Sequence, residues 1–166
     1  AGDMFTQAAE ELHSDRPLAV GDRLNTDIAG GVAAGIPSLM VITGISGHKD
    51  LLTADPAERP TYIAADMMAL FDPVDNSMPG PKAGWKAELA SDGVLQLSSV
   101  DGEVPGGSSE ESLGGADSSQ QARFSDRRSH DALLTAIAAA WEEGAPAVTQ
   151  MMATDSTAQS VIDTWR

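Results

Sequence analysis

The sequence contains no cysteine among its 166 residues. Disulfide bonds, thiol nucleophiles and thiolate metal sites are therefore excluded, and the chain is compatible with a reducing compartment. Aromatic residues make up only 4% of the sequence, so any core must consist mainly of Ala, Val, Leu, Ile and Met. From these absences we expect a cytoplasmic protein.

Basic residues are also scarce, because 10 Lys and Arg stand against 25 Asp and Glu and give a formal net charge of -15. Nucleic acids and anionic membranes both attract a positive protein surface, so we expect neither as a partner. The acidic excess has a second interpretation, which is simply a well solvated surface. No apolar run approaches the roughly 20 residues that a membrane-spanning helix needs. The first residues have neither the basic nor the apolar segment of a secretory signal, and we expect none.

The first part of the chain, from about residue 1 to 72, alternates helical and strand patterns. Buried strands are predicted at residues 18–20, 39–43 and 61–64. Helices are predicted at residues 4–12, 27–34, 49–53 and 66–71. Arg16-Pro17 is expected to end the first helix, Gly35 to end the second, and Asp66 to cap the last. Strands that alternate with helices indicate an α/β fold with a parallel sheet.

The rest of the chain differs in composition and in its predicted secondary structure. Residues 73–84 contain three prolines and two glycines, a composition typical of a linker. Residues 85–166 are predicted to form a small α+β module. Its strands are expected at residues 85–89, 94–100 and 147–151, its helices at residues 132–143 and from Asp155 or Ser156 to 165, and its hairpin turn at Asp92-Gly93. Residues from about 101 to 130 are rich in Gly, Ser, Asp, Glu and Gln, and we predict that they are disordered.

The strongest chemical signal is the block L-A-V-G-D-R-L-N-T-D-I at residues 18–28. Asp22 falls just past the carboxyl end of a predicted strand, where open α/β sheets bind ligands. Asp27 falls in the first turn of the next helix, so both carboxylates can converge on one Mg²⁺, a cation that takes one or two carboxylates. Gly21 lets the backbone turn without a side chain in the way. In an alternative interpretation, Asp27 only stabilises the helix dipole and Asp22 is an ordinary turn residue.

The block and the residues after it resemble one family. They are similar to the fourth motif of the haloacid-dehalogenase (HAD) superfamily, in the branch of p-nitrophenyl-phosphatase-like and glycerol-3-phosphate-phosphatase-like enzymes. That motif reads V-G-D-R-L-x-T-D-I and is followed by a helix, A-G-I-P and an apolar strand ending in T-G. The matching segments are residues 20–28, 34–37, 39–44 and an Arg-Pro-Thr-Tyr at residues 59–62. The resemblance covers residues 17–71 and implies the C-terminal half of a Rossmann-like core.

The resemblance also implies an activity, which is Mg²⁺-dependent hydrolysis of a small phosphorylated metabolite through a phosphoaspartyl intermediate. By match, Asp22 is the direct Mg²⁺ ligand, and Asp27 holds a metal-bound water or orients the site. Gly21, Arg23 and Asn25 are the loop residues expected beside the phosphate.

Other parts of the family pattern are absent from these residues. The nucleophile motif D-x-D-G-T/V does not occur, and neither does the family's Lys a few residues before Met4 and Phe5. The cap domain that selects the substrate is also missing. We therefore expect no catalytic residue in this chain and no activity from it alone, together with a need for the missing N-terminal half or another chain. Without that half the strand at residues 18–20 is an open edge, and residues 1–72 alone are expected to be marginally stable. The alternative is a truncated, catalytically inert regulatory or binding module.

The C-terminal module is similar to the degenerate acetyltransferase-like (GNAT-type) extension of some glycerol-3-phosphate phosphatases. It has no loop of the type that cradles the coenzyme A pyrophosphate, so we expect a packing or regulatory role. Its tryptophans, Trp85, Trp141 and Trp165, are expected in the core.

Overall fold

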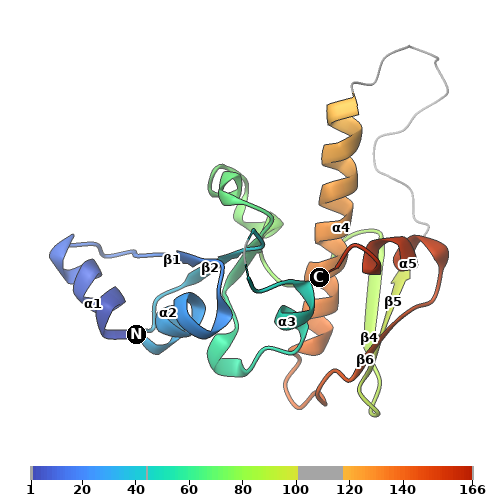
Figure 1. Ribbon diagram of the computed structural model, residues 1–166, viewed down its shortest axis with the longest axis horizontal. Coiled ribbons are helices and arrows are strands. Elements are labelled where there is room, and N and C mark those ends of the chain that lie inside the picture. The colour runs from blue at the N-terminus through green and yellow to red at the C-terminus, as the bar shows by residue number, and fades with distance from the viewer. Residues whose placement is uncertain (1, 44, 101–117, 166) are drawn as a thin grey trace.

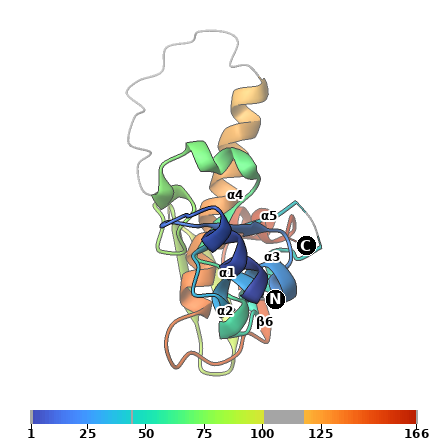
Figure 2. The ribbon, with the colours of Figure 1, turned by 90° about the vertical axis from the view of Figure 1, so that its left-hand side faces the viewer.

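The computed structural model describes residues 2–43, 45–100 and 118–165, and it contains two three-stranded sheets (Figure 1). The long helix α4 (Ser118–Ala140) stands between the sheets, and the short helix α3 (His48–Leu52) lies between the first sheet and α4. At the end farthest from the second sheet lies α1 (Gly2–Glu11), which packs on α2 (Ala29–Ala33) (Figure 2).

The first sheet contains the three predicted strands, which are parallel and have the order β1-β2-β3. Their bounds are β1 (Ala19–Gly21), β2 (Ser38–Val41) and β3 (Tyr62–Ala64). All four residues of β2 are buried, as expected for the central strand of a parallel sheet. β1 is an edge strand among the described residues, so the prediction of an open edge holds for this part of the chain.

The helices of this part differ from the prediction at their ends. The predicted helix at residues 27–34 begins earlier, as a π-helical turn (Leu24–Ile28) that continues into α2. Gly35, with a φ of 66°, ends it as predicted. The first helix, however, ends at Glu11 and not at Arg16-Pro17, because the chain turns at His13, whose φ is 49°.

Short 3₁₀ turns complete the first part of the chain. They are Pro56–Glu58, Met67–Phe71 and Val74–Asn76. Asp66 caps the second of these turns as predicted, since its Oδ1 accepts a hydrogen bond from the Met68 amide at 2.7 Å.

The second sheet has the order β4-β5-β6, with β4 (Trp85–Leu89) antiparallel to β5 (Val94–Ser99) and β6 (Gln150–Ala153) parallel to β5. The predicted hairpin is confirmed, and Gly93 at its turn has a φ of 84°. β6 begins three residues later than predicted. The last helix, α5 (Ser156–Ile162), is capped by Asp155, whose Oδ1 accepts from the Ala158 amide at 2.8 Å.

The predicted disorder at residues 101–130 is wrong for residues 118–130, which form the first half of α4. The predicted helix at residues 132–143 is therefore longer at its start, and it ends at Ala140. Residues 132–137 are all buried and anchor the helix. Once such a segment is fixed, adding further helical turns costs little, even for a polar sequence. Residues 101–117 lie outside the described residues.

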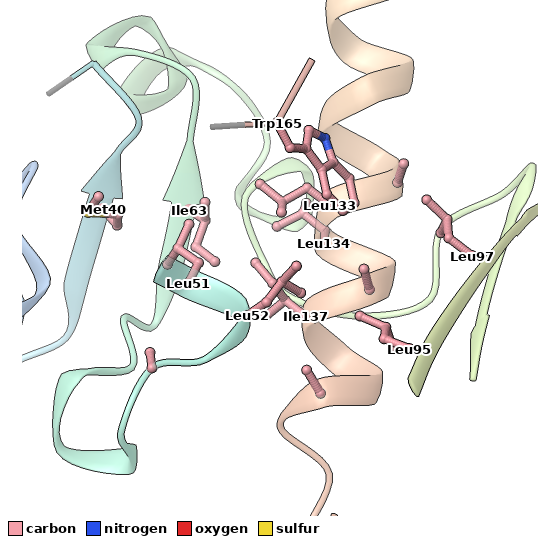
Figure 3. Packing of buried hydrophobic residues seen from close by; sticks show 14 of the residues in the cluster. Met40, Leu51, Leu52, Ile63, Leu95, Leu97, Leu133, Leu134, Ile137 and Trp165 are labelled. Carbon is pink, nitrogen blue, oxygen red and sulfur yellow. The ribbon is translucent and has the colours of Figure 1, made fainter. Parts of the chain in front are cut away.

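One hydrophobic core joins the two parts of the chain (Figure 3). Leu133, Leu134 and Ile137 of α4 form its centre. The first part contributes Leu24, Ile28, Met40, Leu51, Leu52, Ala54 and Ile63, and the second part contributes Trp85, Leu95, Leu97, Ala158 and Trp165, among others. Division into separate domains stays a prediction, but these residues exclude water together.

The segment predicted as a linker, residues 73–84, is tied down at several points. The Ile63 amide donates to the Ser77 carbonyl at 2.8 Å, and the Lys82 amide donates to Thr135 Oγ1 at 3.0 Å. The Gly80 amide donates to the Leu134 carbonyl at 3.2 Å. Across the described ranges, no helix has both the length and the apolar character needed to cross a membrane.

Candidate metal and phosphate site

The predicted site is the loop that connects β1 to the π-helical turn. Leu24 and Ile28 are 5% and 0% exposed, and they anchor the turn in the core. With these two side chains directed inward, the polar residues between them remain on the surface, and Asp22 and Asp27 are half-buried at the two ends of the loop. The core thus supports a loop that carries two half-buried acidic residues at the carboxyl edge of the sheet.

Asp27 folds back over the loop. Its Oδ2 accepts hydrogen bonds from the backbone N–H groups of Asp22 and Arg23, both at 3.2 Å. Its Oδ1 lies 3.5 Å from the Thr26 hydroxyl oxygen, which donates to it. Asp27 therefore fixes the backbone at Asp22, and this contact is compatible with an orienting role.

Gly21 makes the position of Asp27 possible. A Cβ atom placed on Gly21 would lie 2.2 Å from Asp27 Cβ and 2.4 Å from its Oδ2, much closer than atoms can approach. Any side chain at this position would displace the carboxylate. The motif needs glycine here because it needs space.

Asp22 is held by its backbone at the end of β1. Its carbonyl accepts from the Ser46 amide at 3.3 Å, and its amide donates to Asp27. Within the part of the chain that the structure describes, its carboxylate makes no hydrogen bond or ion pair. A half-buried carboxylate without a protein partner is available to a cation.

The loop residues predicted beside the phosphate divide into two groups. Gly21 and the Arg23 backbone lie directly against Asp27, whereas the side chains of Arg23 and Asn25 are exposed. The structure therefore brings Gly21, Asp22 and Asp27 together and leaves the other two side chains at the surface above them.

Sequence reasoning missed Ser46. This residue lies in the loop after β2, and its Oγ accepts from the Leu24 amide at 3.2 Å while its own amide donates to the Asp22 carbonyl. The carboxyl ends of adjacent parallel strands meet at one sheet edge. The signal available in the sequence was therefore the polar residue that follows the second strand.

The donor set suits Mg²⁺. Within residues 2–43, 45–100 and 118–165, no three His, Cys, Asp or Glu side chains gather in a manner suited to a metal ion. Mg²⁺ does not require such a cage, because it uses one or two carboxylates and completes its shell with water and substrate oxygens. Asp22, whose carboxylate has no partner among the described residues, fits that requirement, while Asp27 Oδ2 accepts from the Asp22 and Arg23 amides.

The histidines lie apart from the loop. His130 on α4 is partly buried, with its Nε2 3.0 Å from the Ile63 carbonyl oxygen. Burial away from water lowers the pKa of His130 below its ordinary value. The ring thus joins α4 to β3 in its neutral form.

Comparisons with known proteins show which families and folds this chain resembles. Residues 1–70 match the model of the HAD-hydrolase-like family. Over 98 residues the chain is 38% identical to the D-glycerol 3-phosphate phosphatase of Mycobacterium tuberculosis, an alignment that covers 59% of this chain and 28% of that enzyme.

Two crystal structures of a glycerol phosphate phosphatase from the same organism resemble the whole fold. The magnesium complex has a TM-score of 0.76 at 28% identity and the calcium complex 0.75 at 27%, and each match covers 99% of this chain. These matches cover 42% and 43% of the solved chains, so the present chain spans less than half the length of its relatives. The predicted α/β fold is confirmed, and the findings support the predicted resemblance to the glycerol phosphate phosphatase branch of the HAD-like hydrolases.

Proposed function

We propose that the loop between β1 and the π-helical turn is the magnesium-binding half of a phosphomonoester hydrolase site. The observation that carries the proposal is the half-buried Asp22 carboxylate, which stands at the carboxyl end of a parallel strand and has no protein partner among the described residues. Open α/β sheets bind their ligands at that edge. A magnesium ion bound there would stabilise negative charge on a phosphoryl group during its transfer.

The residues of this chain then have distinct roles. Asp22 is the direct metal ligand. Asp27 acts through Asp22, because the two hydrogen bonds to its Oδ2 fix the Asp22 backbone and so aim its carboxylate. The exposed Arg23 side chain supplies a positive charge that attracts the phosphate, and Asn25 supplies a neutral donor beside it.

Turnover requires groups that this sequence does not contain. A phosphoaspartyl reaction needs a nucleophilic Asp and an acid/base Asp, and the sequence has no D-x-D-G-T/V segment. We propose that a complementary segment or a second chain supplies them, and that the 166 residues alone bind Mg²⁺ without hydrolysing phosphate esters. Glycerol phosphate, the substrate in the name of the mycobacterial relatives, is the first small phosphorylated metabolite to test.

Calorimetric titration with MgCl₂ tests the metal site directly. We expect the chain to bind one Mg²⁺ and the Asp22→Asn variant to bind none. Asp126→Asn is the matched control, because Asp126 is an exposed carboxylate on α4, far along the chain from the loop. Equal Mg²⁺ affinity in the Asp22→Asn variant and the unaltered chain would refute the assignment.

A chimera tests the activity. The 166 residues replace the matching segment of the mycobacterial phosphatase, and hydrolysis of glycerol phosphate and p-nitrophenyl phosphate is measured with Mg²⁺. We expect activity that Asp22→Asn abolishes and Asp126→Asn retains. A folded chimera that binds Mg²⁺ but hydrolyses neither ester would favour the inert binding module instead.

A further inference from the structure

We propose that the C-terminal part of the chain positions the Asp22 loop by clamping both ends of α3 with two tryptophans, Trp165 and Trp141. α3 has only five residues, and a helix this short does not persist without tertiary contacts. Its position therefore depends on what packs against it. The consequence for metal binding rests on the proposed function, whereas the consequence for the order of the loop does not.

Trp165 holds the start of α3. Its ring stacks on His48, the first residue of α3, with ring centroids 6.0 Å apart and planes inclined by 6°. Trp165 is only 3% exposed, and its Nε1 has no hydrogen-bond partner among the described residues. Packing and stacking therefore place this indole, and its location is fixed by the shape of the core (Figure 3).

Trp141 holds the end of α3. Its Nε1 donates a hydrogen bond to the Leu51 carbonyl at 3.0 Å, and the same carbonyl accepts from the Ala54 amide at 3.3 Å. Arg59 lies over the same indole, 5.3 Å from the ring centroid, and its Nε donates to the Ala54 carbonyl at 3.2 Å. The segment after α3 is thus fastened to the same tryptophan.

The side chains of α3 complete the attachment. Leu51 and Leu52 are 0% and 3% exposed. In Figure 3 they lie at the core that Ile137 and Leu134 of α4 also form. Residues that follow position 130 therefore contact both ends of α3, and its buried face lies between Ile63 of β3, beside Leu51, and Ile137 of α4, beside Leu52.

The start of α3 is two residues away from the site. Ser46 bonds the Asp22 carbonyl through its amide and the Leu24 amide through its Oγ, at 3.3 and 3.2 Å. Gly47 follows, and its amide donates to Asp50 Oδ2 at 2.7 Å within α3. Since only Gly47 separates Ser46 from His48 and each residue spans at most about 3.6 Å, we expect a shift of His48 to move Ser46. Movement at Trp165 is transmitted to the backbone that carries Asp22.

Amide hydrogen exchange measured by NMR on the whole chain separates this positioning role from a general effect on stability. The test variants are Trp165→Ala and His48→Ala. Trp165→Phe is the conservative variant that keeps a ring for stacking. Leu97→Ala is the control, because Leu97 is a buried residue of β5 whose loss weakens the core without removing a clamp.

After correction for global stability, we expect the Leu24 and Ser46 amides to exchange about two- to tenfold faster in both test variants, the range that loss of one aromatic pair gives. Trp165→Phe should restore most of the protection, and Leu97→Ala should leave it unchanged. If Trp165→Ala does not fold, the His48→Ala variant tests the proposal by itself. His48 is partly exposed, so this substitution removes the stacking partner of Trp165 and leaves the buried indole in place. Exchange no faster than in Leu97→Ala would overturn the proposal.

A MgCl₂ titration of the same variants separates this proposal from the proposed function. We expect weaker Mg²⁺ binding by a similar factor in Trp165→Ala and His48→Ala. If even the unaltered chain binds no Mg²⁺, the proposed function fails, while the exchange rates still decide whether the clamps position the loop. If Mg²⁺ binds equally to all variants and the exchange of the Leu24 and Ser46 amides is unchanged, the clamps do not position the Asp22 loop.

Discussion

Replacing Gly21 with alanine should lower the free energy of unfolding, because the new methyl group would displace the Asp27 carboxylate. The new Cβ would fall 2.2 Å from Asp27 Cβ and 2.5 Å from its Cγ, so Asp27 has to move. Its hydrogen bonds to the Asp22 and Arg23 amides, both 3.2 Å long, are then lost or stretched. Overpacking costs about 1–3 kcal/mol, and each hydrogen bond to a charged group contributes about 1.5–3 kcal/mol where it is shielded from water. Because the loop is half exposed, we expect a total loss of about 2–4 kcal/mol.

Urea denaturation followed by tryptophan fluorescence measures this loss. Gly80→Ala is the matched control, because a Cβ there meets nothing within 4 Å. That substitution should be neutral, or stabilising by up to about 1 kcal/mol through the unfolded chain. If Gly21→Ala unfolds at the same urea concentration as Gly80→Ala, then Asp27 does not occupy the space above Gly21, and the explanation of this glycine is wrong.

Three further predictions concern the rest of the fold. The pKa of His130 is lowered, so the unfolded chain binds more protons than the folded chain below about pH 6.5. The contribution of the neutral ring to the free energy of unfolding should be fully present above this pH and be lost as the pH falls toward the folded pKa. Between pH 7.5 and 5 the melting temperature should therefore fall less in His130→Gln than in the unaltered chain. The pKa of Asp155 is lowered by hydrogen bonds from the Ala158 and Ser99 amides. The contribution of Asp155 to the free energy of unfolding is therefore present above its ordinary pKa of 3.8 and is lost as the pH falls below it. Asp155→Ala should lower the melting temperature at pH 7 and should abolish this part of the acid sensitivity. Ile137→Ala should lower the free energy of unfolding by about 2–5 kcal/mol. Far-ultraviolet circular dichroism and fluorescence should then report one common unfolding transition at a lower temperature, and two separate transitions would contradict a shared core.

Much of the first sheet was predictable from the sequence, because parallel strands are short apolar runs and the glycines and prolines between them are strong stop signals. The Asp22–Asp27 loop was predictable for a related reason: its pattern combines a strand end, two acids and a glycine within a few residues. Boundaries were less predictable. The turn at His13 arises from the local backbone and not from the proline four residues later.

The second part was harder to predict because its structure depends on distant residues. Residues 118–130 have a composition typical of disorder, yet they continue a helix that is anchored by Leu133 and Leu134. Ser46 was missed for a similar reason, since its partners Asp22 and Leu24 lie more than 20 positions earlier. Contacts of this kind follow from the way strands are assembled, and a single local pattern does not contain them.

The place of α4 between the two sheets has a consequence for how such a chain changes over evolutionary time. The buried side chains of α4 belong to one core with both halves: in Figure 3, Leu133, Leu134 and Ile137 lie on the side of Leu52, and Leu95 and Leu97 of β5 lie on the other side of the helix. Because both sides of α4 lie in this core, a substitution that shifts the helix toward one sheet also changes its packing against the other. Exchange of only one half with a relative would set unmatched surfaces against α4. We therefore expect the two segments to be inherited together, and productive recombination to occur outside them.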